Sequence, residues 1–138
     1  MNPYLAYQNN QNSAWTRIDM LLALFDSAIG RLEAASTALR ANDAAKAGPL
    51  LERSMAIVAE LSAGLDFRYG ELAVNLLRLY EYAVHCIASR TVEKVEGALG
   101  VLRELREGML GIRDEAVRLE REGLIPPANT LHRLEMLA

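Results

Sequence analysis

Glu81, His85 and Cys86 are the residues in this sequence whose types and spacing could carry chemistry. Glu81 and His85 stand four apart, so a helix would place them on one face, where they could bind a metal. A di-iron bundle needs a Glu-x-x-His pair on each of two helices, and neither His85 nor His132 has a glutamate three residues before it. A histidine phosphotransfer bundle would place a lysine near the histidine, and none follows His85 closely. Phosphotransfer or metal binding at His85 is the one enzymatic alternative.

Cys86 adjoins His85, but neighbouring residues on a helix point about 100° apart, which disfavours a nucleophile–base pair. We interpret Cys86 as a buried structural cysteine. The sequence has no glycine-rich phosphate loop and no zinc-ligand spacing. We therefore predict that the protein is not an enzyme and has no catalytic residue, metal or cofactor.

Composition places the chain among soluble single-domain proteins. It has 138 residues, of which 51% are hydrophobic and 24% charged, and its net charge is -3. That balance excludes a wholly disordered chain and gives no electrostatic case for binding nucleic acid. A single cysteine fits a reducing compartment. The N-terminus lacks the basic and then apolar pattern of a signal peptide, and no apolar run approaches the roughly 18 residues that a membrane span needs. We expect a cytoplasmic protein without membrane insertion.

Apolar residues recur at helical spacing along nearly the whole chain. The pattern predicts an all-α antiparallel up-down four-helix bundle. An N-terminal arm or lid (1–12) precedes the bundle (13–122), and the tail (123–138) forms either a short fifth helix or a mobile segment. Four helices are predicted. The first begins at 13 or 14, with Ser13 as its cap, and ends at 40, and the second ends at about 65 and begins either at Asp43 or, after a break at Gly48, at Pro49. The third runs from 71 to 89 and the fourth from 91 to 121.

The last of these helices has the most regular pattern. Its apolar residues are spaced by three and four, close to the 3.5-residue period of bundle packing, and Thr91 and Gly123 suit its two ends. We expect its arginines to form a solvated face shared with glutamates. The apolar stripe comprises Val92, Val95, Leu99, Leu102, Leu105, Met109, Ile112, Ala116 and Leu119, and the arginines are Arg103, Arg106, Arg113, Arg118 and Arg121.

Two segments carry more apolar surface than a bundle core requires. The helix predicted at 71–89 is apolar on two sides, one with Leu72, Leu76, Leu79, Ala83 and Ile87 and the other with Val74, Leu77, Tyr80 and Val84. Such a helix is either central in its bundle or presents one side to a partner. The N-terminal segment carries Tyr4, Leu5 and Tyr7 among polar residues, which suggests a removable lid over that side or simply an ordered arm.

Four stretches of the sequence form a recognisable series: Tyr4-Leu5-Ala6-Tyr7-Gln8; Met20 to Ile29, reading MLLALFDSAI; Leu61 to Asp66, closing on Leu-Asp; and Asn75 to Tyr82, reading NLLRLYEY. In this order, and over residues 4 to 110, the sequence resembles the FliS family of flagellar export chaperones specific for flagellin. The family usually has glycine where Ser27 stands, and often tryptophan where Met109 stands.

The resemblance implies a cytosolic chaperone that binds the disordered C-terminal segment of flagellin as helices in an apolar groove. It would prevent premature polymerisation and deliver flagellin to the type III export apparatus of the bacterial flagellum. We expect Leu77, Tyr80 and Val84 to offer groove surface and Asn75 to bind client backbone. Tyr4, Tyr7 and Gln8 would form the displaceable lid or a client contact, with Asp26 a polar partner of Tyr80 or Tyr82. The alternative is a helical-bundle interaction module that forms a homodimer and has no export role.

Overall fold

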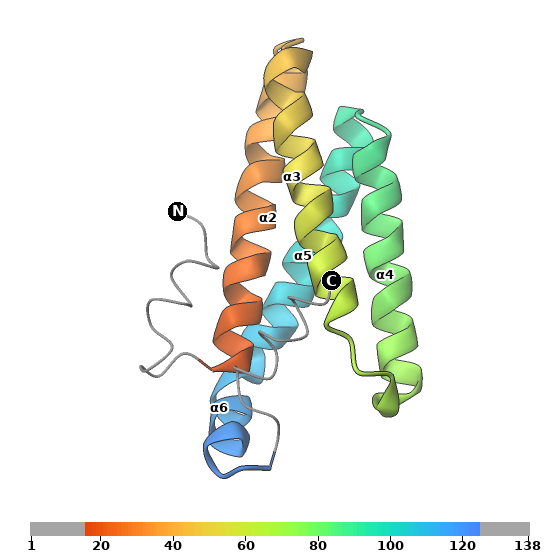
Figure 1. Cartoon of the computed structure of the whole chain (residues 1–138). Helices are drawn as coiled ribbons and strands as arrows, with labels where there is room; N and C mark the ends of the chain where they lie inside the picture. The colour runs from red at the N-terminus through yellow and green to blue at the C-terminus, as the bar shows by residue number, and fades with distance from the viewer. Residues whose placement is uncertain (1–15, 125–138) are drawn as a thin grey trace.

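The computed structural model describes residues 16–124, and every regular element in that part of the chain is helical (Figure 1). No strand occurs among these residues, so the predicted all-α class is confirmed. No helix within 16–124 is long and apolar enough to span a bilayer. The arm with Tyr4, Tyr7 and Gln8, the predicted cap Ser13 and the tail from 125 onward lie outside the described residues. The elements are α2 (Arg17–Arg40), α3 (Ala44–Ala63), the 3-10 turn η1 (Phe67–Tyr69), α4 (Glu71–Ala88), α5 (Val92–Gly111) and α6 (Arg113–Arg121).

The four long helices pack in the cyclic order α2, α3, α4, α5, as an up-down bundle requires (Figure 1). α2 packs against α3 and α5, and α4 packs against the same two helices. The connections are short, which makes consecutive helices antiparallel neighbours. Phe25 of α2 and Tyr80 of α4 meet inside the bundle with ring centroids 6.4 Å apart. The predicted bundle architecture is therefore confirmed.

Helix α2 begins at Arg17, later than predicted, because Thr16 is its N-cap. The Thr16 hydroxyl accepts a hydrogen bond from the backbone N–H of Asp19 at 3.4 Å, which satisfies one of the free donors at the helix start. The helix ends at Arg40, as predicted. Asn42 follows with φ +58°, a left-handed conformation that asparagine tolerates better than most residues, and turns the chain toward α3.

The predicted break at Gly48 is wrong, because α3 runs without interruption through Pro49. Asp43 starts the helix by accepting a hydrogen bond from the Lys46 N–H at 3.1 Å. Pro49 is the sixth residue of the helix, and the carbonyl that it leaves without a hydrogen bond belongs to Ala45 in the first turn. Both Ala45 and Pro49 are exposed, so solvent can hydrate that carbonyl.

The single helix predicted from 91 to 121 is also wrong. Thr91 caps its start as expected, but α5 ends at Gly111 and α6 begins at Arg113. Ile112 between them has φ −106° and ψ 4°, well away from helical values, and its side chain is 58% exposed instead of facing the core. Gly123 ends α6 as predicted, with φ +77° and the paired backbone hydrogen bonds of a Schellman motif.

A ladder of ion pairs joins α2 to α5 and α6, where we expected only a solvated arginine face. Its members on α2 recur every seven residues and so form one stripe along that helix. Asp26 pairs with Arg106 of α5, not with Tyr80 or Tyr82. The pairs are exposed or half-exposed, so each adds little stability, but together they favour this register of α2 against α5. They are Arg40–Glu96, Glu33–Arg103, Asp26–Arg106 and Asp19–Arg113.

Candidate helix-binding surface

Helix α4 exposes large apolar side chains on the flank that faces α5. Leu72 is 61% exposed, Leu79 38% and Tyr82 50%, and helical periodicity places the three within one arc of the helix. An alanine side chain in place of Gly97 on α5 would lie 3.8 Å from the Tyr82 hydroxyl oxygen, which locates this flank beside α5. We call Leu72, Leu79 and Tyr82 the α4 stripe. Exposed apolar residues aligned in this way are typical of a protein-binding surface.

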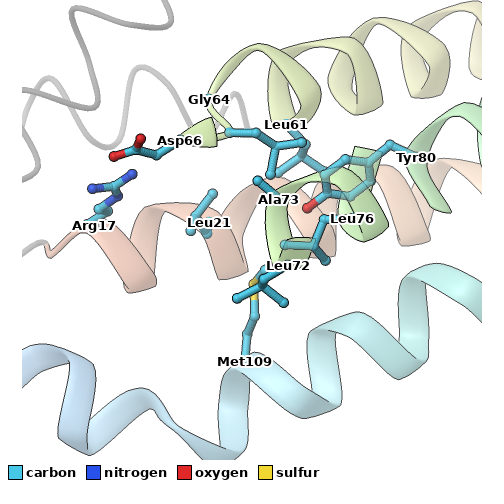
Figure 2. A pocket seen from close by; sticks show the side chains of 11 residues that line it. Arg17, Leu21, Leu61, Gly64, Asp66, Leu72, Ala73, Leu76, Tyr80 and Met109 are labelled. Carbon is cyan, nitrogen blue, oxygen red and sulfur yellow. The ribbon is translucent and has the colours of Figure 1, made fainter. Parts of the chain in front are cut away.

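The α4 stripe begins at a pocket of about 150 Å³ between the helices (Figure 2). Leu72 lines the pocket, and Tyr80 lines it from within the bundle, because its side chain is only 2% exposed. Burial raises the pKa of the Tyr80 phenol to about 12, so the hydroxyl is neutral at ordinary pH. The other lining residues are Arg17 and Leu21 of α2, Leu61, Gly64, Leu65 and Asp66 at the end of α3, Ala73 and Leu76 of α4, and Met109 of α5.

One end of this apolar pocket carries a pair of opposite charges. Figure 2 shows the Arg17 guanidinium close to the Asp66 carboxylate. Asp66 accepts hydrogen bonds from the side chain and the backbone N–H of Arg68, and these bonds lower its pKa to about 2, with a minor contribution from the charge of Arg17. An apolar cavity with a few polar groups at one end is the usual form of a site that binds and orients a ligand.

The structure does not bring the predicted groove residues together as one open surface. Leu77 and Val84 are half-buried on the opposite flank of α4, and Val84 packs against the core. Tyr80 is a core residue, so the expectation that it offers open surface is wrong. Asn75 is exposed and lies by helical periodicity on the side of the α4 stripe.

The helical spacing placed Leu72 and Leu79 on one side of the helix with Leu76, Ala83 and Ile87, but Leu72 and Leu79 are exposed. The buried face of α4 instead uses Ala73 and Ala83 with Tyr80, Cys86 and Ile87. Small residues on this face let α4 approach its neighbours closely, while Leu72 and Leu79 lie at the surface. Ala73, which neither predicted side included, was the available signal.

The residues first considered for chemistry do not converge on a site in the described part of the chain. Glu81 and His85 are exposed, whereas Cys86 is buried and free. The Tyr82 hydroxyl interacts with the Cys86 side chain as a hydrogen-bond donor, and this interaction raises the pKa of the phenol. Within residues 16–124 no group of three histidine, cysteine, aspartate or glutamate side chains could hold a metal ion.

Comparison with protein families gives a match over most of the chain. The family model described as flagellar protein FliS matches residues 1–116, which include α2 to α5 and the start of α6. The chain belongs to the FliS family. Membership makes the protein a flagellar export chaperone, in agreement with the helical bundle and its exposed apolar stripe. No curated protein matches the chain.

Proposed function

We propose that this FliS-family chaperone binds the C-terminal segment of flagellin as helices along the α4 stripe, with an apolar client side chain in the pocket. Binding would take place in the cytosol, prevent premature polymerisation of flagellin and deliver it to the flagellar type III export apparatus. The observation that carries the proposal is the continuity of exposed apolar surface from the pocket, through Leu72, to Leu79 and Tyr82.

The dimensions of the α4 stripe suit a helical client. Leu72 and Tyr82 are ten residues apart, which corresponds to about 15 Å along the helix axis. A client helix lying beside α4 would meet this stripe over about three of its own turns, with apolar residues at helical spacing. Asn75 lies on the same side and can hydrogen-bond the client. Tyr4, Tyr7 and Gln8 stay proposed as a lid that the client displaces.

A calorimetric titration with the C-terminal segment of flagellin from the same organism tests the proposal. We expect one-to-one binding and a gain of helix in the peptide. The double variant Leu72→Asp, Leu79→Asp replaces two exposed leucines and should weaken binding roughly a hundredfold, because each lost apolar contact contributes about 1–1.5 kcal/mol.

The matched control is Leu110→Asp, which replaces a leucine of similar exposure (44%) that does not line the pocket. It should leave the affinity unchanged. Equal weakening by both variants would refute the α4 stripe as the binding surface. No binding to the folded wild-type protein, together with a concentration-dependent dimer in sedimentation, would instead support the homodimeric interaction module.

A further inference from the structure

Helix α6 is a nine-residue helix that packs on the first turns of α2. Val117 is buried against Ile18 and Leu22 in a small apolar cluster separate from the main core. Figure 1 shows α6 at the end of the bundle where α2 begins. The surface formed by Ile18 and Leu22 is thus covered by an amphipathic helix of the same chain.

Two polar contacts flank Val117 and fix α6 in place. The Arg113 Nε donates to Asp19 Oδ1 at 2.6 Å and its Nη2 to Asp19 Oδ2 at 3.1 Å, a two-pronged ion pair. Glu120 Oε1 accepts a hydrogen bond from the backbone N–H of Arg17 at 3.0 Å. Arg17 is the first residue of α2, where the backbone N–H groups have no acceptor within the helix. The docking residues of α6 therefore form a pattern in which the basic Arg113 is followed four residues later by the apolar Val117 and three residues after that by the acidic Glu120.

The joint between α5 and α6 is the single residue Ile112. Ile112 would need rotations of about 45° in φ and in ψ to reach helical values, and these rotations would reorient α6 relative to α5. No side chain caps the start of α6. The apolar spacing of the sequence runs through Ile112 without a break, so a continuous α5–α6 helix is a second conformation that the same pattern supports.

Helix α6 has interactions of its own that would survive separation from α2. Arg118 pairs with Glu115 and Glu122 at three- and four-residue spacing. Asp114 and Glu115 lie in the first turn, where the helix dipole favours acidic side chains. A short helix alone is marginal in water, but joined to α5 it would be the last two turns of a long helix. It can therefore move as a unit.

We infer that α6 is a displaceable latch on a second helix-binding surface, which a client helix with the same basic–apolar–acidic pattern occupies when α6 moves away. The inference rests on the proposed function, since it extends the client site. Met109 links the two regions, because it lines the pocket and also packs against the cluster of Ile18, Leu22 and Val117. Opening the latch would continue the client surface from the pocket onto α2.

Hydrogen exchange and peptide binding together test the latch. The variant Arg113→Gln, Val117→Ala weakens the docking of α6, and its matched control, Arg103→Gln, Val101→Ala, makes the same changes on α5. In the first variant, amide exchange in residues 113–121 should rise at least tenfold more than exchange in α5. The dissociation constant for the flagellin C-terminal segment should fall by about the same factor, because a closed latch lowers the competent fraction.

The control should leave both exchange in 113–121 and peptide affinity close to wild type. Exchange of α6 that rises only in step with the core would overturn the latch, since α6 would then unfold with the whole domain. Local opening with unchanged or weaker peptide binding would overturn the competition with client. If the wild-type protein binds no peptide at all, the proposed function fails, and exchange in 113–121 alone then decides whether α6 opens.

Discussion

Substitution of Tyr80 separates the contribution of this residue to the core from any contribution to client binding. Its side chain is 2% exposed and packs on Phe25 with a centroid distance of 6.4 Å. Removing a buried aromatic ring costs about 3–5 kcal/mol, from lost burial and the cavity left behind. Typical domain stability is about 5–15 kcal/mol, so Tyr80→Ala should remove at least about a fifth of it.

Tyr80→Phe is the matched variant, because it keeps the ring and removes only the hydroxyl. Burial already disfavours ionisation of this phenol, whose pKa is raised to about 12, and no hydrogen bond joins its hydroxyl to the described residues. We expect Tyr80→Phe to change stability by less than about 1 kcal/mol. Urea unfolding followed by circular dichroism should show a midpoint about 2 M lower for Tyr80→Ala and nearly unchanged for Tyr80→Phe.

Peptide affinity supplies the second readout. Tyr80→Phe should bind the flagellin segment as the wild type does, since the hydroxyl lies inside the bundle. A Tyr80→Phe protein of normal stability that has lost binding would refute the assignment of Tyr80 to the core and restore it as a client contact. A Tyr80→Ala midpoint close to wild type would refute the calculated packing contribution.

Three further predictions concern two capping residues and two glycines. Hydrogen bonds from Arg68 lower the pKa of Asp66 from 3.8 to about 2, so the ionised carboxylate contributes to stability fully above pH 4 and loses that contribution as pH falls toward 2. In urea titrations between pH 5 and pH 2.5, Asp66→Asn should therefore lose less stability than the wild type does. Thr91→Ala should lower the unfolding free energy by about 1 kcal/mol through loss of the α5 cap, and an unchanged midpoint would contradict this. Gly30→Ala should stabilise the protein by about 0.5–1 kcal/mol, because the added Cβ would enter open space, and Gly70→Ala should destabilise it by about 1–2 kcal/mol, because Gly70 has φ +58°. Thermal melts measure both changes, and the same sign for both would contradict the backbone argument.

The sequence predicted those parts of the fold that depend on local pattern. Helical spacing identified the four-helix bundle, and residues such as Thr91, Asp43 and Gly123 located helix ends because capping is a local interaction. The error at Pro49 has a local cause as well. A proline near the start of a helix removes the hydrogen bond of only one carbonyl, and here that carbonyl lies in the exposed first turn. This effect is milder than the break in the helix that we predicted.

The remaining differences come from tertiary contacts that spacing does not encode. The apolar period continues through Ile112, yet the helix breaks there and α6 packs on α2. The sequence shows a charged stripe on α2, because charged residues recur there every seven positions, at Asp19, Asp26, Glu33 and Arg40. It does not show which residues of α5 and α6 pair with them. The exposure of Leu72 and Leu79 depends on how α4 packs against its neighbours, which only the packed structure shows.

The most direct test of the central claim is a titration of methyl-labelled protein with the C-terminal segment of flagellin, followed by nuclear magnetic resonance. The account predicts large shifts of the Leu72 and Leu79 methyl signals and little change at Leu110, with saturation at one peptide per chain. Saturable binding that shifts Leu110 but leaves Leu72 and Leu79 unchanged would contradict the α4 stripe as the client site.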